Sequence, residues 1–280
     1  MKVCRTLKLR DDTDIVRNNI IYYYNIGIKD QFIMLHLPTP ELLDIIKKVE
    51  KELPALNLRL LYWNKEGKGL NPIDGDYLKV LTDMAQSEGF NWIVGSDSDE
   101  FLILRKHNTI QELIKEYDNN EIISLLFKWV NYYLLEKSDS PFYLSMTKRS
   151  NYMPWTKSIG KFNDKMYFVQ GLHHIADKIH GQISTDLKQI RIDASIAYYA
   201  HFPYRSEKQF VDKNIKQSEK FGDWRKEKVE NDPYYFNKKW DNMFKNKLWS
   251  NNLDKNPDNN YNKEYLSDPV NPELMELKND

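Results

Sequence analysis

The sequence predicts an α/β fold in which a mostly parallel sheet is flanked by helices and followed by a helical C-terminal extension. Three observations support this prediction. Strand-like and helix-like runs alternate through residues 3 to 95, which is typical of a parallel sheet covered on both faces. Further strand-like runs continue to residue 202. Residues 206 to 249 then show a charged, helical pattern.

The first β-α unit consists of "VCRTLKL", a strand, and "DDTDIVRNNIIYYYNIG", a helix. Apolar residues of the second run recur at roughly helical spacing. Asp12 or Thr13 can cap this helix, because short polar side chains accept hydrogen bonds from the first free backbone N–H groups. Gly27 is expected to end it.

Two more units follow the same order. "DQFIMLHL" is predicted to be a strand, and "TPELLDIIKKVEKEL" a helix with Thr39 as N-cap and Pro40 at the first helical position. "LNLRLLYW" is the third strand. After a glycine-containing loop, "DYLKVLTDMAQSEGF" is the third helix, closed by Gly89.

The fourth strand, "NWIVG", runs directly into Asp97, Ser98, Asp99 and Glu100 before the apolar "FLIL". Burying carboxylates without partners is expensive, so this cluster indicates a cation or a group of donors. Asp97 and Asp99 would point the same way on a regular strand and can reach one hard cation, whereas Glu100 would oppose them. A loop of capping aspartates is the alternative, since Asp-Ser-Asp is ordinary turn chemistry.

Ligands of parallel sheets bind beyond the carboxyl ends of the strands. The polar tips at Asp11 and Asp12, at His36, at Lys65 and at the acidic cluster should therefore share one edge of the sheet.

After residue 104 the sequence predicts a short helix in "TIQELIKEY" and a long strand in "EIISLLFKWVNYYLL". Residues 138 to 164 are expected to be a polar loop. "MYFVQGLHHI" and "IRIDASIAYYAHF" are expected to be further strands that end in histidines. The last 30 residues have too little apolar content to fold alone, so we expect them to wrap the domain or to be loosely ordered.

Composition narrows the function. The 41 basic and 41 acidic residues cancel, which argues against a broad nucleic-acid-binding surface. The single Cys4 excludes an internal disulfide and a cysteine-based zinc site. The N-terminus has no apolar signal segment and no run is long enough to span a membrane, so we expect a cytoplasmic protein, with any membrane contact peripheral on the inner face.

Three ordered stretches resemble GT-A glycosyltransferases, in particular a family-2-like and family-92-like group. They are "LRDDTDIVRNNIIYYYNIGIKDQFIML", "NWIVGSDSDEFLIL" with its Asp-x-Asp-Glu-Phe motif, and "AHFPYRSEKQFVDK". The resemblance implies a Rossmann-like GT-A domain, a nucleotide-sugar donor, UDP- or GDP-linked, and Mn²⁺ or Mg²⁺ as cofactor. It covers roughly residues 3 to 213.

The same resemblance implies roles for individual residues. Asp99 is the metal ligand expected first, with Asp97 contacting the metal or the donor ribose and His201 completing the metal site; a structural histidine is the alternative for His201. The donor is expected near Asp11, Asp12, Lys65, Lys68 and Arg205. Relatives often carry an Asp or Asn after the second strand to read the base, whereas this chain has "LHLPTPE", so the base is left open.

The acceptor side and the catalytic base are less defined by the sequence. His173 and His174 are candidates for contacting the acceptor, and on a strand they would face opposite ways. Glu100 neighbours the expected metal site and is a candidate base, or it binds a backbone or arginine partner instead. Asp139, Asp164 and the two histidines are the other candidates for the base.

The sequence therefore predicts a metal-dependent hexosyltransferase that passes a sugar from a nucleotide-sugar donor to a glycan or lipid-linked acceptor in surface polysaccharide biosynthesis. A haloacid-dehalogenase-type phosphatase and a non-catalytic carbohydrate-binding module are the alternatives. The predicted domains are a catalytic domain over 1–204, divided near 104 into donor and acceptor halves, a helical extension over 205–250 and a polar tail over 251–280. The sequence leaves the oligomeric state open.

Overall fold

The computed structural model describes residues 1–63, 74–136, 138–153, 156–162, 166–168, 175–177, 188–221, 227, 231–232, 234–246 and 266–277. The side chains of residues 74–77, 166–168, 175–177, 216–221 and 243–246 lie outside this description. The chain forms two compact units. Unit 1 comprises Met1–Val130, Tyr152–His201 and Glu273–Asp280, and unit 2 comprises Asn131–Asn151 and Phe202–Pro272.

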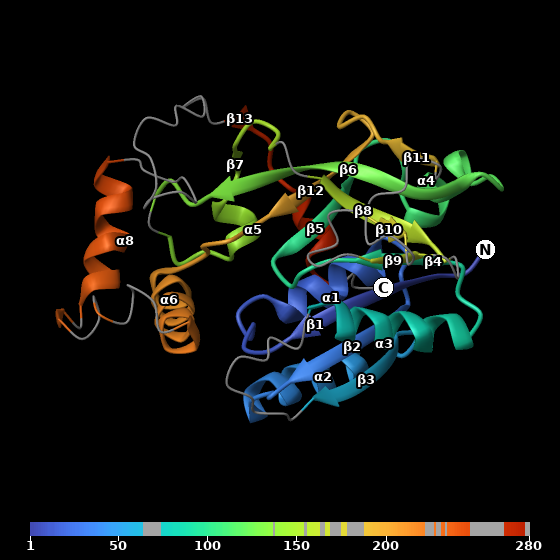
Figure 1. Ribbon diagram of the computed structural model, residues 1–280. Coiled ribbons are helices and arrows are strands. Elements are labelled where there is room, and N and C mark those ends of the chain that lie inside the picture. Colours follow the sequence, from blue (N-terminus) through green and yellow to red (C-terminus); the bar gives the residue numbers. More distant parts are fainter. Residues whose placement is uncertain are drawn as a thin grey trace. The chain divides into compact units, whose positions relative to one another are not determined.

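The N-terminal half of unit 1 is a parallel sheet with the order β3-β2-β1-β4. Its strands are β1 (Val3–Leu9), β2 (Asp30–His36), β3 (Asn57–Trp63) and β4 (Trp92–Gly95). Figure 1 shows β1, β2 and β3 side by side. These four strands lie where the sequence predicts them, because each one is a compact apolar run bounded by turn residues.

Helices cover both faces of this parallel half. The side chains of α1 (Val16–Asn25) and α2 (Pro40–Glu52) pack against one set of strand residues that includes Leu7 and Ile33. The helix α3 (Asp74–Ser87) packs against the alternate set, which includes Cys4 and Phe32. Successive strand residues point to opposite faces, so one strand serves both cores. The predicted α/β fold, a mixed and mostly parallel sheet flanked by helices, is confirmed.

Antiparallel strands extend the sheet beyond β4. Strand β8 (Thr156–Lys161) lies between β4 and β6 (Ile122–Tyr133), and β11 (Lys188–Arg191) pairs in parallel with β6. Strand β5 (Glu100–Leu104) pairs with β12 (Ala197–His201) in antiparallel register, with Glu100 opposite His201. The short helix α4 (Ile110–Tyr117) follows β5, as predicted.

The structure differs from three sequence-based expectations about these elements: the predicted loop is wrong, and the two predicted strand regions are more divided than expected. Residues 138–164 contain the buried strand β8, together with α5 (Phe142–Ser145) and β7 (Lys148–Arg149). Met166–Phe168 and Ile175–Asp177 form the separate paired strands β9 and β10. Residues 188–201 likewise form two strands, β11 and β12. Alternation alone does not reveal the break between β11 and β12, because tertiary pairing decides which residues join the sheet.

The start of α1 also differs from its prediction. The N-cap is Ile15, and no side chain caps the helix. The backbone oxygen of Asp12 accepts the N–H groups of Ile15 at 3.2 Å and Val16 at 2.9 Å instead. At the other end, Gly27 has φ +99° and ends the helix as predicted. Thr39 caps α2 as predicted, accepting from the N–H of Leu42 at 3.2 Å.

Unit 2 has its own small core. The helices α6 (Glu207–Phe221) and α8 (Tyr235–Asn246) meet through Phe210, whose ring centroid lies 5.3 Å from that of Trp240. Strand β13 (Leu266–Ser267) pairs with β7, and Arg149 Nε lies 2.6 Å from Asp268 Oδ2. Aromatic side chains at helical spacing therefore fill a core here.

The C-terminal residues of unit 1 pack against α1. At the end of the short 3₁₀ helix η2 (Pro272–Leu274), the backbone oxygens of Leu274 and Met275 accept hydrogen bonds from Asn25 and Asn18 at 3.0 and 2.9 Å. Met275 is fully buried. Among the described residues, no helix is long and apolar enough to cross a membrane.

Candidate functional site

The acidic cluster forms a turn between β4 and β5. Strand β4 ends at Gly95, and the backbone N–H of Glu100 donates to the oxygen of Asp97 at 3.2 Å as β5 begins. Ser98, Asp99 and Glu100 are buried, whereas the Asp97 side chain is 53% exposed. The turn breaks the strand, so the expectation that Asp97 and Asp99 share one strand face does not apply, and each carboxylate has its own surroundings.

Lys157 binds two of the three carboxylates. It comes from β8, and its Nζ lies 2.8 Å from Glu100 Oε1 and 3.3 Å from Asp97 Oδ2. The Lys157 side chain is 2% exposed. Burial alone would lower the pKa of Lys157, but Glu100 and Asp97 raise it above its ordinary value. The lysine therefore stays protonated at neutral pH and balances one negative charge of the turn.

Glu100 is held on both sides. Its Oε2 accepts the backbone N–H of Asp97 at 3.1 Å, while Oε1 faces Lys157. Burial raises the pKa of Glu100, and the Lys157 ammonium partly offsets this effect. The sequence left open whether Glu100 acts as a base or binds a backbone or arginine partner. Its observed partners are a backbone N–H and a lysine.

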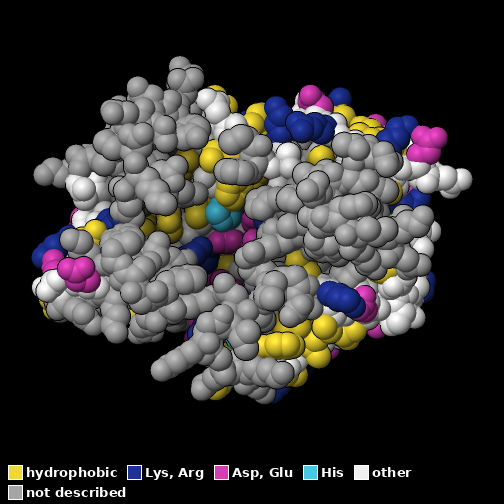
Figure 2. Space-filling model, in the orientation of Figure 1, with side chains coloured by type: hydrophobic (Ala, Val, Ile, Leu, Met, Phe, Trp, Pro, Cys, Tyr) yellow, Lys and Arg dark blue, Asp and Glu magenta, His cyan; other side chains and the backbone are white. Residues whose placement is uncertain are grey.

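Asp99 faces a histidine from another strand. His201 ends β12 opposite Glu100, and its Nε2 lies 3.5 Å from Asp99 Oδ2. The imidazole stacks on the indole of Trp129, with ring centroids 4.7 Å apart and an interplanar angle of 26°. Figure 2 shows a histidine side chain beside acidic side chains on one face of the molecule. Stacking on Trp129 fixes the ring plane and so directs Nε2 at the carboxylate.

A buried polar network supports the turn from below. Arg5 of β1 is fully buried and donates to Ser96 Oγ from Nε at 3.0 Å and from Nη2 at 2.7 Å, and also to Asn19. Asn19 Nδ2 and the Tyr23 hydroxyl both donate to the backbone oxygen of Glu100 at 3.2 Å. The network thus holds the Ser96 side chain at the start of the acidic turn and the Glu100 backbone at its end.

Arg5 brings a second buried cation near the carboxylates. Burial lowers the pKa of Arg5 to about 10, and the neighbouring Tyr23, Tyr199, Asp97 and Glu100 oppose that shift. The guanidinium therefore remains charged at neutral pH, and it lies 3.8 Å from the ring centroid of Tyr23. Three carboxylates with two cations leave the turn one net negative charge, which favours a further cation.

Asp99 and His201 fit a hard divalent cation. A ligand oxygen lies about 2.1 Å from a Mg²⁺ ion, so neighbouring ligands of one ion are separated by about 3 to 4 Å. The 3.5 Å between Asp99 Oδ2 and His201 Nε2 agrees with this spacing. Carboxylate oxygen and imidazole nitrogen both suit Mn²⁺. Within the described part of the chain, no group of three or more His, Cys, Asp or Glu side chains could hold a metal ion.

The other predicted residues are distributed as follows. Asp11 and Asp12 follow the carboxyl end of β1, and Asp11 Oδ2 lies 3.5 Å from Arg10 Nε. His36 ends β2. Arg205 belongs to unit 2, is buried, and donates to the oxygen of Phe202 at 2.7 Å. Lys65, Lys68, His173, His174 and Asp164 lie outside the described residues.

Sequence reasoning missed several residues around the turn, namely Lys157, Trp129, Arg5, Asn19 and Tyr23. Arg5 gave a signal, since a cation stands in the middle of the apolar strand "VCRTLKL". Lys157 gave little signal, because "TKSIGK" shows no apolar alternation and was assigned to a loop. Only the pairing of β8 with β4 brings it to the carboxylates.

The model of glycosyltransferase family 92 matches residues 84–257, which is more than half of the chain and includes the acidic turn, Lys157 and His201. No curated protein sequence matches the chain.

The chain is also similar, at low sequence identity, to several solved structures. The mannosyltransferase PcManGT from Pyrobaculum calidifontis, in complex with GDP-Man and Mn²⁺, is 11% identical with a TM-score of 0.44, and the match covers 77% of this chain and 64% of that one. HddC from Yersinia pseudotuberculosis is 12% identical with a TM-score of 0.37, covering 76% and 97%. A glycosyltransferase involved in glycosylation of the major capsid of PBCV-1 is 8% identical with a TM-score of 0.31, covering 71% and 93%.

Proposed function

The chain belongs to glycosyltransferase family 92, and from this premise we propose that it transfers a hexose from a nucleotide-sugar donor to a glycan or lipid-linked acceptor with the help of a divalent cation. The observation that carries this proposal is the placement of Asp99 and His201 side by side, with 3.5 Å between Oδ2 and Nε2, at the turn that follows β4. The donor is proposed to be UDP- or GDP-linked.

We assign the cation, Mn²⁺ or Mg²⁺, to Asp99 and His201. Such ions usually keep several waters and bind through one or two protein ligands plus substrate phosphates, so two side chains suffice. When bound, the cation would offset charge that develops on the leaving diphosphate. Asp97, with its exposed carboxylate, is assigned to the donor ribose. Asp11, Asp12, Lys65, Lys68 and Arg205 remain candidates for contacts with the rest of the donor.

The catalytic base is proposed to be a residue other than Glu100. A base must lie within hydrogen-bond reach of the acceptor hydroxyl, whereas Glu100 is 2% exposed and both of its oxygens have protein partners. We propose that Glu100 positions the turn instead. Asp139 and Asp164, and also His173 and His174 as acceptor-side residues, remain candidates for the base. A role in surface polysaccharide assembly at the inner membrane face is part of the proposal.

The test of this function is Asp99→Asn. The amide keeps the shape of the side chain but removes the anionic ligand, so we expect kcat/KM for sugar transfer, or for donor hydrolysis without acceptor, to fall by about a hundredfold or more. The thermal unfolding midpoint should stay close to that of the parent protein. Enzymatic release of UDP or GDP from nucleotide sugars, with and without Mn²⁺, measures the effect.

Asp118→Asn is the matched control, because Asp118 is likewise an aspartate beside a basic side chain, 2.7 Å from Lys161 Nζ, on the surface of unit 1. Its activity should equal that of the parent protein. Full activity of Asp99→Asn, or of the parent protein with divalent cations chelated, would overturn the assignment. A protein that binds nucleotide sugar but never turns it over would favour the carbohydrate-binding alternative. Family membership gives no support to the phosphatase alternative.

A further inference from the structure

Lys157 occupies the position from which a cation would bridge Asp97 and Glu100. Its Nζ contacts Glu100 Oε1 at 2.8 Å and Asp97 Oδ2 at 3.3 Å, and the lysine side chain is 2% exposed. Asp97 is therefore directed toward a permanent cation of the protein, while Asp99 faces His201. The two aspartates of the turn are separated by their partners.

We propose that Lys157 is a positioning residue that keeps Asp97 out of the coordination sphere of the divalent cation, so that the cation binds tightly only together with a donor diphosphate. The inference rests on the proposed function. Two protein ligands hold the ion weakly, and the diphosphate oxygens of the donor complete its coordination. Lys157 would thereby make tight cation binding depend on the donor.

Charge supports this inference. In the turn, Lys157 balances one carboxylate and the buried Arg5 offsets another, which leaves one net negative charge for the incoming ion. The binding free energy of a divalent ion is smaller at a turn with one net negative charge than at the same turn without Lys157, which would carry two. Solvent around the partly exposed Asp97 screens its charge, so this difference is reduced but not abolished. An ammonium group carries charge but accepts no hydrogen bond, so Lys157 cannot itself ligate a metal ion.

Geometry points the same way. Lys157 lies on β8, whose register with β4 places Ile159 opposite Val94, and the strand backbone therefore fixes where the ammonium stands. Glu100 is anchored by the N–H of Asp97 at 3.1 Å and anchors Lys157 in turn. Asp97 cannot turn toward Asp99 without giving up its contact with this buried ammonium.

The experiment measures Mn²⁺ binding directly, by the electron paramagnetic resonance signal of free Mn²⁺, without nucleotide and with saturating UDP or GDP. The informative variant is the double substitution Lys157→Gln with Glu100→Gln. Removing Lys157 alone would leave the Glu100 charge buried and unpaired and so endanger folding, whereas two amides can bond to each other. Asp97 is then released from its cation.

For the double variant we expect the Kd of Mn²⁺ without nucleotide to fall by about tenfold relative to the parent protein, because one carboxylate becomes available. The added effect of UDP or GDP on Mn²⁺ affinity should shrink accordingly. Glu100→Gln alone, which leaves Lys157 on Asp97 and removes one negative charge from the turn, should bind Mn²⁺ no more tightly than the parent protein. Lys157→Arg, which keeps a cation there, should also bind weakly.

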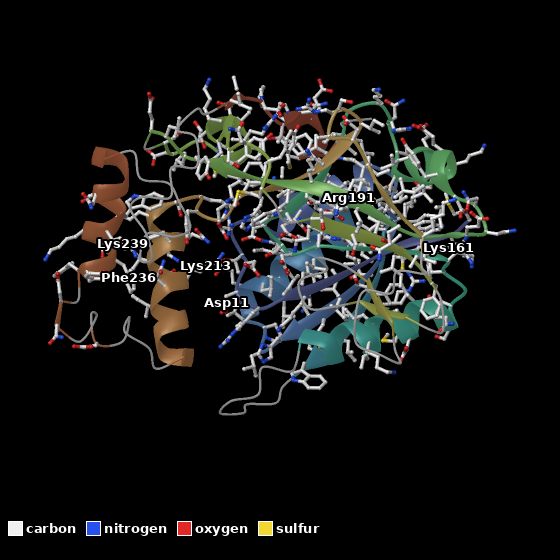
Figure 3. All side chains as sticks on the ribbon, turned by 45° about the horizontal axis from the view of Figure 1, so that its top comes forward. Asp11, Lys161, Arg191, Lys213, Phe236 and Lys239 are labelled. Carbon is white, nitrogen blue, oxygen red and sulfur yellow. The ribbon has the colours of Figure 1, made fainter. Side chains whose placement is uncertain are left out.

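Lys161→Gln is the control for loss of a lysine from the same strand. Lys161 binds Asp118 at 2.7 Å, and Figure 3 shows it at the opposite end of unit 1 from Asp11. Its Mn²⁺ affinity should be unchanged. If the parent protein binds Mn²⁺ with UDP or GDP but the double variant binds Mn²⁺ alone no tighter, this inference fails. If the parent protein binds no Mn²⁺ even with nucleotide, the proposed function fails first.

Discussion

At the scale of single residues, the acidic turn shows how buried polar groups are accommodated. The three carboxylates divide between two basic partners: Asp97 and Glu100 share Lys157, and Asp99 faces His201. Burying a charge without such a partner is costly, so the identity of the partner decides what the carboxylate can do. We therefore propose that Glu100 positions the turn and that Asp99 binds the cation.

Cys4 allows a test of burial at this scale. The thiol is fully buried, and burial raises its pKa well above the ordinary value of 9.0, with Asp30 adding to the shift. We expect no reaction of the native protein with a thiol-specific disulfide reagent at pH 8, and reaction of one thiol per chain after unfolding in denaturant. Rapid reaction of the native protein would contradict the buried position.

The raised pKa of Cys4 makes the free energy of unfolding depend on pH in the alkaline range. Below pH 9.0 the thiol is protonated in both states, and above it only the unfolded chain loses the proton. The contribution of Cys4 to stability is therefore complete below pH 9.0 and decreases as the pH rises further. Cys4→Ser should remove that part of the alkaline loss, as measured by denaturant unfolding between pH 8 and 10.5.

At the scale of elements, local signals fixed most helix and strand positions. Thr39 caps α2 and Gly27 ends α1, since these residue types satisfy free backbone groups or adopt positive φ at low cost. The prediction that Asp12 or Thr13 caps α1 failed because the backbone oxygen of Asp12 binds the first N–H groups. A backbone oxygen in the preceding turn can therefore satisfy the first N–H groups of a helix in place of a capping side chain.

Gly27→Ala tests the end of α1. Gly27 has φ +99°, and a Cβ there would lie 2.4 Å from Gln111 Oε1, whose side chain donates from Nε2 to the Gly27 oxygen at 2.7 Å. We expect a loss of about 2 kcal/mol in the free energy of unfolding, from the positive φ and the displaced glutamine. Denaturant titration measures this loss.

Gly89→Ala is the control for the backbone conformation alone. Gly89 has φ +78°, and a Cβ there meets nothing within 4 Å. Its loss should be about 1 kcal/mol, smaller than at Gly27. Equal losses at both positions would show that the contact with Gln111 has no effect.

At the scale of the whole molecule, segments far apart in the chain complete each core. The C-terminal residues from Leu274 to Leu277 belong to unit 1, where Asn18 and Asn25 of α1 bind their backbone oxygens. The last 30 residues as a whole have too little apolar content to be expected to fold alone. Residues 274–277 pack in unit 1 because α1 offers donors and an apolar surface.

Met275→Ala tests this long-range packing. Met275 is fully buried, so truncation should cost about 2 to 4 kcal/mol of unfolding free energy through lost burial and a cavity. Glu276→Ala is the matched control, because the side chain of Glu276 is exposed and its removal should change the free energy of unfolding by less than about 0.5 kcal/mol. A Met275→Ala protein as stable as the control would mean that the C-terminal segment does not contribute to the core.

By itself, the sequence determined the parallel β-α units and the position of the acidic turn, because these depend on local periodicity, caps and breaks within one run of residues. The tertiary structure decided the partners. Lys157 reaches Glu100 from a strand that sequence assigned to a loop, and His201 reaches Asp99 across an antiparallel pair. Such contacts join residues some 60 to 100 positions apart, and strand register, which no local pattern encodes here, sets them.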